Sequence, residues 1–494
     1  MIINAMRRRI PRVWLLVIPA LYVLYFYGLS GAGLLGPDEP RYAAIGREMA
    51  RSGDWITPRL WGEPWFEKPA LLYWMTGAAF RLGLGENLAP RLPVALLSVA
   101  FLLFYQRIME RRFGARAAWF ATLVLATSAG WLGFSHIGAT DLPMSAAFAA
   151  AMLLALDWIE KAWVEKGATR RLPWVAALLG VAVLAKGLVP LVLALPLAWC
   201  GRRRLSDWLR PATILSFLIV AAPWYALCYL RNGPIFLEKF FWEHHFERFA
   251  NDSLKHQQPF WFYLPVLAGA LLPWSPALAW LFRRSFYQDA ARRFLLAWML
   301  FGLVFFSLST NKLPGYLLPL LPAAAALAGI ALAEARDARA VLAASGLCLL
   351  AIPLAAAMLP GILEVGLSRA GRPRLDWTWL VPVAAAAAAW WLESRGRRAA
   401  AVALLCLGVT AGVAELEIRT VPALDRTVSA QFLWKQIEPR RSQVCVEQIH
   451  RTYRYGLNYY SVIPLPDCSQ SPRPLAVRQQ PGHPPFLAPR LDPS

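Results

Sequence analysis

The sequence has little charge for its length. Only 16% of its 494 residues are Asp, Glu, Lys or Arg, whereas an average soluble domain carries about 25%. Hydrophobic residues make up 58% of the chain and its mean hydropathy is +0.42. These values exclude an ordinary soluble enzyme and a disordered chain, and they predict an all-α polytopic membrane protein.

Acidic residues are scarce relative to basic ones. The chain has 30 Asp and Glu against 51 Lys and Arg, which gives a net charge of +21. A nucleic-acid-binding protein gathers its basic residues on one soluble face. Here short basic segments alternate with long apolar runs, as they do in the cytoplasmic loops of membrane proteins. The sequence therefore predicts membrane lipids as partners and no nucleic acid.

About thirteen apolar stretches approach the ~20 residues that cross a bilayer. They lie near 12–30, 89–106, 117–134, 140–158, 173–186, 187–200, 212–230, 260–282, 294–309, 316–333, 340–360, 377–392 and 399–415. Every second loop is basic, which predicts a cytoplasmic N-terminus, although the loop at 360–376 breaks this alternation. No signal-peptide cleavage pattern follows the first stretch, so we expect an uncleaved anchor.

Two domains follow from this pattern. We predict a transmembrane domain over 1–415, with outer loops at 31–88 and 231–259, and a small α/β or mixed domain over 416–494 that ends in a Pro-rich tail. An odd number of spans places this tail outside the cytoplasm. Two of the six cysteines, Cys445 and Cys468, lie in it, where a disulfide can persist, and the sequence favours their pairing.

The first outer loop twice places charged residues and a proline before a helix. In Gly36-Pro-Asp-Glu-Pro-Arg-Tyr42, Pro40 suits the first position of an amphipathic helix over 42–51 that lies on the membrane surface. Phe66-Glu-Lys-Pro-Ala70 precedes a second, apolar helix over 70–82. A helix N-terminus suits a phosphate, and Arg41 and Lys68 would add full charges.

Two simpler interpretations of this loop stay open. Asp38 or Glu39 could only cap the first helix. The arginines could pair with lipid headgroups, which is credible for Arg47, Arg51, Arg59 and Arg81.

Three further charged residues lie at the outer ends of predicted spans. Asp141 begins the fourth span, where a carboxylate is costly unless it is paired or solvated, although it could also cap the helix. Lys186 and Lys312 could each extend to the membrane surface. Together with Lys68 and Arg41, they predict a cationic outer pocket.

The second outer loop holds three of the six histidines, His244, His245 and His256, among aromatic and acidic residues. Carboxylate and imidazole groups could bind a divalent metal. No His-Glu-x-x-His pattern is present, and an interfacial aromatic and basic helix is the alternative.

Three motifs of the first outer loop are similar to those of a known family. They are Gly36-Pro-Asp-Glu-Pro-Arg-Tyr42, Ser52-Gly-Asp-Trp-Ile-Thr-Pro58 and Trp65-Phe-Glu-Lys-Pro-Ala-Leu-Leu-Tyr-Trp74. The chain resembles the aminoarabinose transferase-like branch of the protein O-mannosyltransferase superfamily, which comprises GT-C class glycosyltransferases that use polyprenyl-phosphate sugars. The resemblance continues in order to about residue 320, through 138–141, 184–187, 242–249 and 311–316.

The resemblance implies a GT-C fold and a set of site residues. Asp38 would be the catalytic carboxylate, with Asp141 as a second acidic residue in the cavity. Arg41, Lys68 and Lys186 would face the donor phosphate, with Tyr316 near it. Glu67 and His245, preferred over His244, match metal ligands, so a divalent Zn or Mg ion is expected. In the tail, only His450 and His483 could add a further histidine ligand.

The implied reaction is transfer of a sugar from an undecaprenyl-phosphate donor to a lipid A-like or glycan acceptor, on the periplasmic side of a bacterial inner membrane. One alternative is glycosylation of secreted proteins, as in the O-mannosyltransferases. Another is a transporter of lipid-linked sugars. Transporters place ionisable residues near the bilayer midplane, whereas the acidic candidates here lie in outer loops, which argues against transport.

Overall fold

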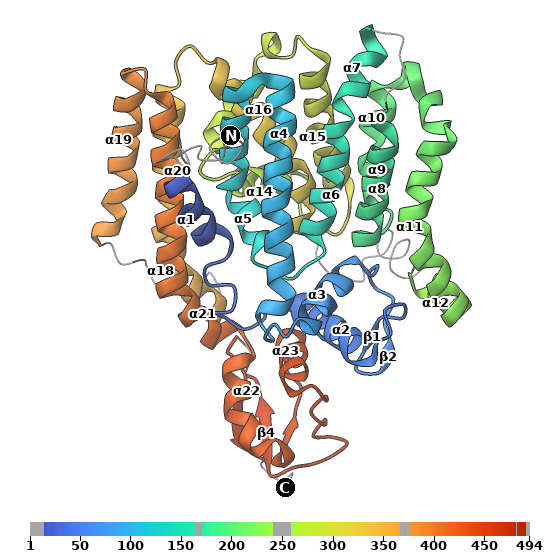
Figure 1. Ribbon diagram of the computed structural model, residues 1–494. Helices are drawn as coiled ribbons and strands as arrows, with labels where there is room; N and C mark the ends of the chain where they lie inside the picture. Colours follow the sequence, from blue (N-terminus) through green and yellow to red (C-terminus); the bar gives the residue numbers. More distant parts are fainter. Residues whose placement is uncertain are drawn as a thin grey trace, which may run out of the picture.

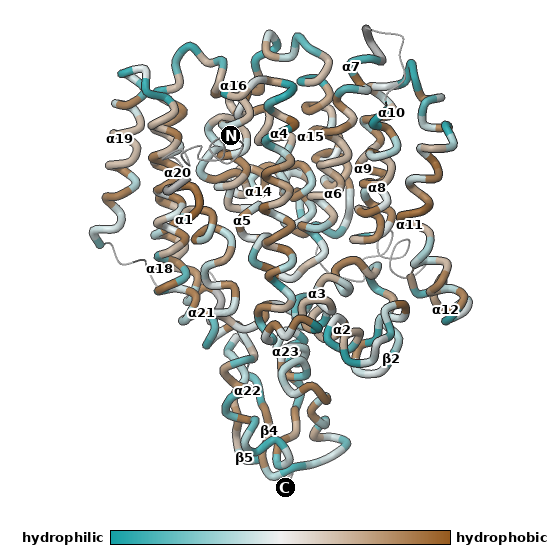
Figure 2. Tube along the Cα trace, in the orientation of Figure 1, coloured by the Kyte–Doolittle hydropathy of each residue, from teal (hydrophilic) through white to brown (hydrophobic). Residues whose placement is uncertain are grey.

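The computed structural model describes residues 14–164, 170–240, 258–365, 373, 376–480 and 482–490. Figure 1 shows a body of helices, with the first outer loop and the C-terminal tail together at one end. Hydrophobic residues run through the helical body, while hydrophilic residues gather at its ends and in the tail (Figure 2). The predicted all-α membrane architecture with a small mixed tail is confirmed.

The helical body is built from long helices and several short or broken ones. Up to the second outer loop it comprises α1 (Trp14–Tyr25), α4 (Leu88–Ala126), α5 (Ala129–Ser135), α6 (Asp141–Leu154), α7 (Leu156–Val164), α8 (Leu172–Lys186), α9 (Val189–Leu193), α10 (Leu195–Cys200), the 3-10 helix η2 (Arg202–Leu209), α11 (Pro211–Asn232) and α12 (Pro234–Leu237). Beyond that loop it comprises η4 (Phe260–Phe262), α14 (Tyr263–Ala270), η5 (Ser275–Phe282), η6 (Arg284–Phe286), α15 (Ala290–Leu308), η7 (Pro314–Leu320), α16 (Leu321–Glu334), α17 (Arg339–Cys348), α18 (Ala351–Val365), η8 (Trp377–Trp379), α19 (Leu380–Ser394) and α20 (Arg398–Glu415).

Seven described helices are long and apolar enough to cross a membrane, or eight if one bent pair forms a single span. That pair, Phe260–Ala270 and Ser275–Phe282, is bent by 119°. The helices at Leu172–Lys186 and Val189–Cys200 are apolar but shorter. The thirteen predicted spans therefore stay a prediction.

The stretch 107–116, which separates the predicted spans 89–106 and 117–134, is helical for most of its length. Helix α4 continues through it as far as Gly114, whose φ of 80° and ψ of 162° break the helix. A positive φ is accessible to glycine because it has no Cβ. The two parts of α4 therefore change direction at this residue.

One of the most buried helices of the body, α16, is rich in alanine. Nearly all of its residues are buried, and Gly329 lies so close to α4 that a Cβ there would approach the backbone nitrogen of Ala121 to 2.2 Å. Small residues let two helices approach closely, which is the usual packing device inside a membrane. This contact fixes α16 against α4 at the centre of the body.

Both predicted helices of the first outer loop are confirmed. They are α2 (Asp38–Ser52) and α3 (Leu71–Arg81), joined by the short antiparallel strands β1 (Arg59–Leu60) and β2 (Glu63–Pro64). Helix α2 begins two residues earlier than Pro40. Its apolar residues Tyr42, Ile45 and Met49 are buried in the protein core. The apolar face of this amphipathic helix therefore packs against the protein itself, and its place along the membrane surface stays a prediction.

The tail carries three short α-helices, a π-helix, a 3-10 helix and a three-stranded sheet. The elements are the π-helix η9 (Leu416–Thr420), α21 (Val421–Val428), α22 (Gln431–Ile437), η10 (Glu438–Gln443), β3 (Val444–Val446), α23 (Arg451–Ser461), β4 (Leu475–Arg478) and β5 (Phe486–Pro489). β4 pairs in parallel with β3 and antiparallel with β5. Cys445 and Cys468 form a disulfide with an S–S distance of 2.11 Å, as the sequence favoured.

The tail is docked on the first outer loop by polar contacts. The backbone N–H of Leu34 donates to the Tyr460 hydroxyl at 2.8 Å, and that of Gly33 donates to Asp425 at 2.7 Å. Arg47 is buried, donates to the Tyr459 carbonyl at 2.5 Å and lies 4.3 Å from the Tyr459 ring. The alternative that Arg47 pairs with lipid headgroups is therefore wrong, because this guanidinium joins the loop to the tail.

Candidate active site

A cavity of about 470 Å³ opens where the first outer loop meets the helical body. The predicted site residues in its lining come from five segments that are far apart in the sequence. They are the start of α2, the turn before α3, the start of α6, the end of α8 and the start of η7. Six predicted site residues line this cavity, namely Asp38, Glu67, Lys68, Asp141, Lys186 and Tyr316.

A network of ion pairs on one side of the cavity centres on Arg41. Its guanidinium pairs with Asp38 and donates to Glu67 Oε2 at 2.8 Å. Lys68 Nζ lies 3.4 Å from Glu67 Oε1. Asp38 is half exposed, whereas Glu67 is buried. Two cations thus share one buried carboxylate at the cavity wall.

Three aromatic rings surround the Arg41 guanidinium. Its central carbon lies 5.8 Å from the centres of the Tyr42 and Trp65 rings and 5.1 Å from that of Tyr455. Burial by itself lowers the pKa of Arg41, but the carboxylates of Glu67 and Asp38 more than offset this, so the pKa rises above its ordinary value. The charge of Arg41 is therefore permanent, and the tail contributes Tyr455 to its surroundings.

The opposite side of the cavity carries a second ion pair. Lys186, the last residue of α8, donates to Asp141 Oδ1 at 2.6 Å. Its ammonium group lies 5.3 Å from the centre of the Tyr316 ring. Asp141 begins α6 but makes no capping hydrogen bond there. The capping alternative for Asp141 is therefore wrong, and its carboxylate instead orients Lys186.

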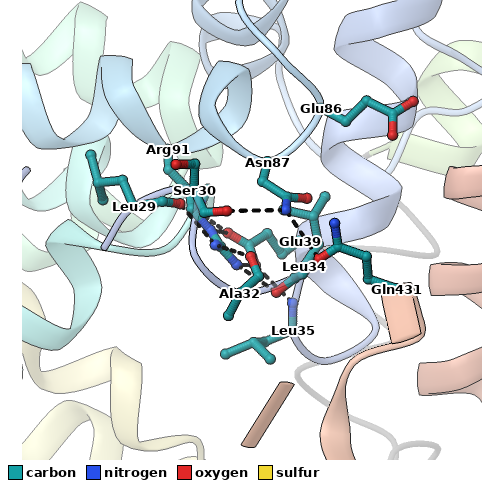
Figure 3. Close-up of polar contacts among 12 residues, drawn as sticks. Leu29, Ser30, Ala32, Leu34, Leu35, Glu39, Glu86, Asn87, Arg91 and Gln431 are labelled. Carbon is teal, nitrogen blue, oxygen red and sulfur yellow. Dashed lines mark hydrogen bonds and ion pairs between the residues drawn. The ribbon is translucent and has the colours of Figure 1, made fainter. Parts of the chain in front are cut away.

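Glu39, which follows Asp38 in the chain, has a different environment. Its carboxylate is fully buried and forms a two-point ion pair with Arg91 of α4, at 2.7 and 2.8 Å (Figure 3). It also accepts from the backbone N–H groups of Gly138 at 2.9 Å and Leu35 at 2.8 Å. These four N–H donors together fill the hydrogen-bonding capacity of the Glu39 carboxylate.

Arg91 in turn holds the loop that leads into α2 in place by hydrogen bonds. Its guanidinium donates to the carbonyls of Leu29, Ala32 and Gly33 at 2.8 to 3.0 Å (Figure 3). Neither Asp38 nor Glu39 forms a side-chain cap of α2. The capping alternative is wrong for both residues, since Glu39 fixes the loop and Asp38 faces the cavity.

Sequence reasoning missed Arg91 and Tyr455. Arg91 could have been found, because a charged residue inside a predicted span over 89–106 requires a buried partner. No sequence pattern marked Tyr455 as a site residue, because it belongs to the tail and reaches the site only when the chain folds. Lys312, by contrast, does not line the cavity and donates instead to the Ser309 carbonyl at 2.5 Å.

The metal that the family resemblance implies stays a prediction, because His245, one of its expected ligands, lies outside the described residues. Glu67 already interacts with two cations, Arg41 and Lys68. Between residues 14 and 490, within the described ranges, no three His, Cys, Asp or Glu side chains lie close enough to hold a metal ion. His244, His245 and His256 lie outside the described residues, and His450 caps α23.

Comparison with known proteins shows which sequences this chain resembles. The family model for dolichyl-phosphate-mannose-protein mannosyltransferase matches residues 67–226. An undecaprenyl phosphate-alpha-4-amino-4-deoxy-L-arabinose arabinosyl transferase of Serratia proteamaculans is 33% identical over 317 residues, which cover 62% of this chain and 57% of the relative. A Pseudomonas paraeruginosa protein of the same name is 34% identical over 345 residues, 67% of this chain and 61% of its own. The chain thus spans about three fifths of the length of these curated relatives.

Solved structures extend the likeness to almost the whole chain. The crystal structure of ArnT from Cupriavidus metallidurans bound to undecaprenyl phosphate superposes with a TM-score of 0.73 at 26% identity, and the match covers 94% of this chain and 92% of ArnT. The archaeal oligosaccharyltransferase AglB from Archaeoglobus fulgidus, at 14% identity and a TM-score of 0.51, shares the fold alone. The chain belongs to the aminoarabinose transferase-like branch of the protein O-mannosyltransferase superfamily, with a GT-C fold.

Proposed function

We propose that this protein is a membrane glycosyltransferase that uses an undecaprenyl-phosphate-linked sugar as its donor. The acceptor is a lipid A-like molecule or another glycan on the periplasmic side of the inner membrane. The observation that carries this proposal is the single cavity in which Lys68, Lys186 and Asp38 meet, although they come from distant segments. The names of the relatives in Serratia and Pseudomonas support pentosyl transfer from the same class of donor.

The leaving phosphate determines what the cations do. Transfer breaks the bond between the anomeric carbon of the sugar and a phosphate oxygen, which leaves an additional negative charge on undecaprenyl phosphate. Fixed positive groups aimed at a developing charge usually supply the largest catalytic contribution. Lys68 and Lys186 line the cavity and can contact this phosphate directly, while Arg41 adds its permanent charge from behind Asp38 and Glu67.

Each lysine is already positioned by a carboxylate. Lys186 is held by Asp141 at 2.6 Å and lies near the Tyr316 ring. Lys68 lies 3.4 Å from Glu67. The carboxylates thus orient the ammonium groups before the donor binds, and pre-oriented groups need no reorganisation during the reaction.

Asp38 is the group that meets the acceptor. It lines the cavity and is half exposed, and Arg41 fixes its orientation from one side. A carboxylate in this place can orient the attacking oxygen or accept its proton. An acceptor phosphate is already ionised, so it needs orientation more than deprotonation, whereas a hydroxyl needs both.

A divalent ion held by Glu67 and His245 is a further part of the proposal. If bound, such an ion would neutralise negative charge on the phosphate. The cations named above act on the same phosphate without it.

We also infer the orientation of the chain. The first outer loop and the tail lie at one end of the body, while the ends of α7 and α10, next to basic loops, lie at the other (Figure 1). The cavity is lined by the first outer loop and therefore lies at the end that carries this loop. The positive-inside rule supports an N-terminus in the cytoplasm, with the cavity and the C-terminus in the periplasm.

Mass spectrometry of cells with and without the gene tests the acceptor. If the acceptor is a lipid, lipid A or another glycolipid loses a sugar mass in the deletion strain, and the mass returns when the gene is restored. The matched family model describes a protein mannosyltransferase, so envelope proteins are compared in the same experiment. A change confined to glycoproteins would contradict the lipid acceptor and favour that second function.

A further inference from the structure

A second, smaller cleft lies between the first outer loop and the tail. Its volume is about 270 Å³, and its wall combines guanidinium groups with aromatic and aliphatic side chains. The lining comprises Ala44, Arg47, Glu48, Arg51, Trp61, Gly62, Val462, Ile463 and Pro464. The cleft shares no residue with the lining of the catalytic cavity.

Two residues in strained backbone conformations face this cleft. Trp61 has a φ of 55° and Val462 a φ of 66°, and among the described residues no other non-glycine residue has a positive φ. This conformation is unfavourable for any side chain and most of all for a β-branched one. Such strain concentrates at functional sites, where the surrounding structure maintains it. The protein thus holds an unfavourable backbone on both walls of one cleft.

The charges of the cleft favour an anion. Glu48 accepts a hydrogen bond from the Gly62 N–H at 3.0 Å, and Arg47 donates to the Tyr459 carbonyl and lies 3.4 Å from Glu86. Arg51 is exposed and makes no hydrogen bond or ion pair with any part of the chain that the structure describes. Burial lowers the pKa of Arg47 below its ordinary value, and the charge of Arg51 lowers it further, while Tyr459, Glu86 and Glu48 raise it. An anion between the two guanidinium groups would relieve this repulsion.

The cleft is connected to the catalytic cavity by stacked side chains. The indole of Trp61 stacks on the Tyr455 ring, with centres 5.8 Å apart, and Arg41 lies on that same ring at 5.1 Å. Arg47 and Arg51 also share helix α2 with Asp38. A rise of ~1.5 Å per residue places Arg47 about 13 Å from Asp38 along the helix axis. One extended ligand can therefore occupy the cleft and the cavity together.

We propose that this cleft binds a second phosphate group of the acceptor glycolipid, together with the sugar ring that carries it. Arg51 and Arg47 bind the phosphate and Trp61 packs on the sugar, while the reacting group of the same acceptor lies beside Asp38. This inference rests on the proposed function, because it assumes a phosphorylated saccharide acceptor. It adds that the enzyme selects acceptors with two anionic groups.

Acceptor binding without turnover tests the proposal. The full-length Asp38→Asn variant is placed in nanodiscs, and the binding of diphosphorylated and monophosphorylated lipid A with the same acyl chains is measured. We expect the diphosphorylated form to bind ~tenfold more tightly, as is usual for a charge-assisted hydrogen bond. Adding Arg51→Gln removes this preference. So does Ile463→Asp, which brings a negative charge into the cleft without changing an arginine.

Arg81→Gln is the matched control. Arg81 is exposed on the same outer loop but does not line the cleft, so the preference for two phosphates is retained. Equal effects of Arg51→Gln and Arg81→Gln would overturn the proposal. Displacement of lipid A by an equal amount of phosphatidylglycerol would also overturn it, because the cleft would then bind any anionic lipid.

A separate assay distinguishes failure of the proposed function. The wild-type protein is supplied with an undecaprenyl-phosphate sugar and diphosphorylated lipid A. If no sugar is transferred but the phosphate-dependent binding at Arg51 persists, the cleft assignment stands and the proposed transfer is contradicted.

Discussion

Asp38 and Glu39 are adjacent carboxylates in one motif, and the fold gives them opposite environments. Glu39 is fully buried and receives two hydrogen bonds from Arg91 and two from backbone N–H groups. Both residues line the cavity, but Asp38 is 53% exposed and pairs with Arg41. The difference separates a residue that holds the loop in place from one that is available to a ligand.

This contrast extends to the two arginine partners. Arg91 is buried, and its guanidinium donates hydrogen bonds to Glu39 and to three carbonyls of the loop. Arg41 contacts Asp38, Glu67 and the ring of Tyr455 from the tail. One motif can therefore contain both a structural and a functional ion pair. The structural pair is the one whose carboxylate has all its hydrogen bonds from buried donors.

The largest expected effect is on stability, from Arg91→Leu. This change leaves the Glu39 carboxylate buried without its partner, which typically costs about 3 to 5 kcal/mol. We expect a large fall in the thermal unfolding temperature in detergent and loss of transfer as a consequence. Arg81→Leu, at an exposed position on the same loop, serves as the control. An unchanged unfolding temperature for Arg91→Leu would show that this pair does not hold the loop.

The next largest effect is on activity, from Lys186→Met. Removing one fixed group that stabilises a developing charge typically lowers the rate by about 10²- to 10³-fold. We expect such a loss of transfer, together with weaker binding of undecaprenyl phosphate, while the protein remains folded.

The double variant Lys186→Met/Asp141→Asn separates charge from stability. It removes the ion pair without leaving an unpaired carboxylate, so any loss of stability in the single variant is recovered. Transfer stays low, because the cation is still missing. Recovery of transfer in the double variant would mean that Lys186 serves only to neutralise Asp141.

The smallest effect is expected at the contact with the tail. Tyr455→Leu removes the aromatic face beside Arg41, and a cation–π contact contributes about 0.5 to 2 kcal/mol. We expect KM for the donor to rise severalfold, whereas Tyr455→Phe, which keeps the ring, leaves it unchanged. Equal kinetics for the Leu and Phe variants would remove Tyr455 from the site.

The sequence predicted much of the site because polar residues at the outer ends of apolar helices are costly without a role. Asp38, Lys68, Asp141, Lys186 and Tyr316 were all identified in this way or by family resemblance, and all line one cavity. The helices α2 and α3 also follow from local pattern.

Other features could not be predicted, because they depend on contacts between distant segments. Nothing in the motif itself distinguishes Glu39 from Asp38 until Arg91 of α4 is placed beside one of them. Arg47 had the pattern of a surface residue, but the tail covers it. The number of spans was uncertain for a related reason, since a bend such as the one between α14 and η5 is set by packing rather than by hydropathy.

The most direct test compares Asp38→Asn with Glu39→Gln in one experiment that measures both thermal unfolding and sugar transfer. We predict that Asp38→Asn unfolds at the wild-type temperature but transfers sugar about 10² to 10⁴ times more slowly. Glu39→Gln should lower the unfolding temperature, because Arg91 loses a charged partner in a buried site. Wild-type transfer by a folded Asp38→Asn protein would contradict the central claim that the exposed carboxylate, and not its buried neighbour, takes part in the reaction.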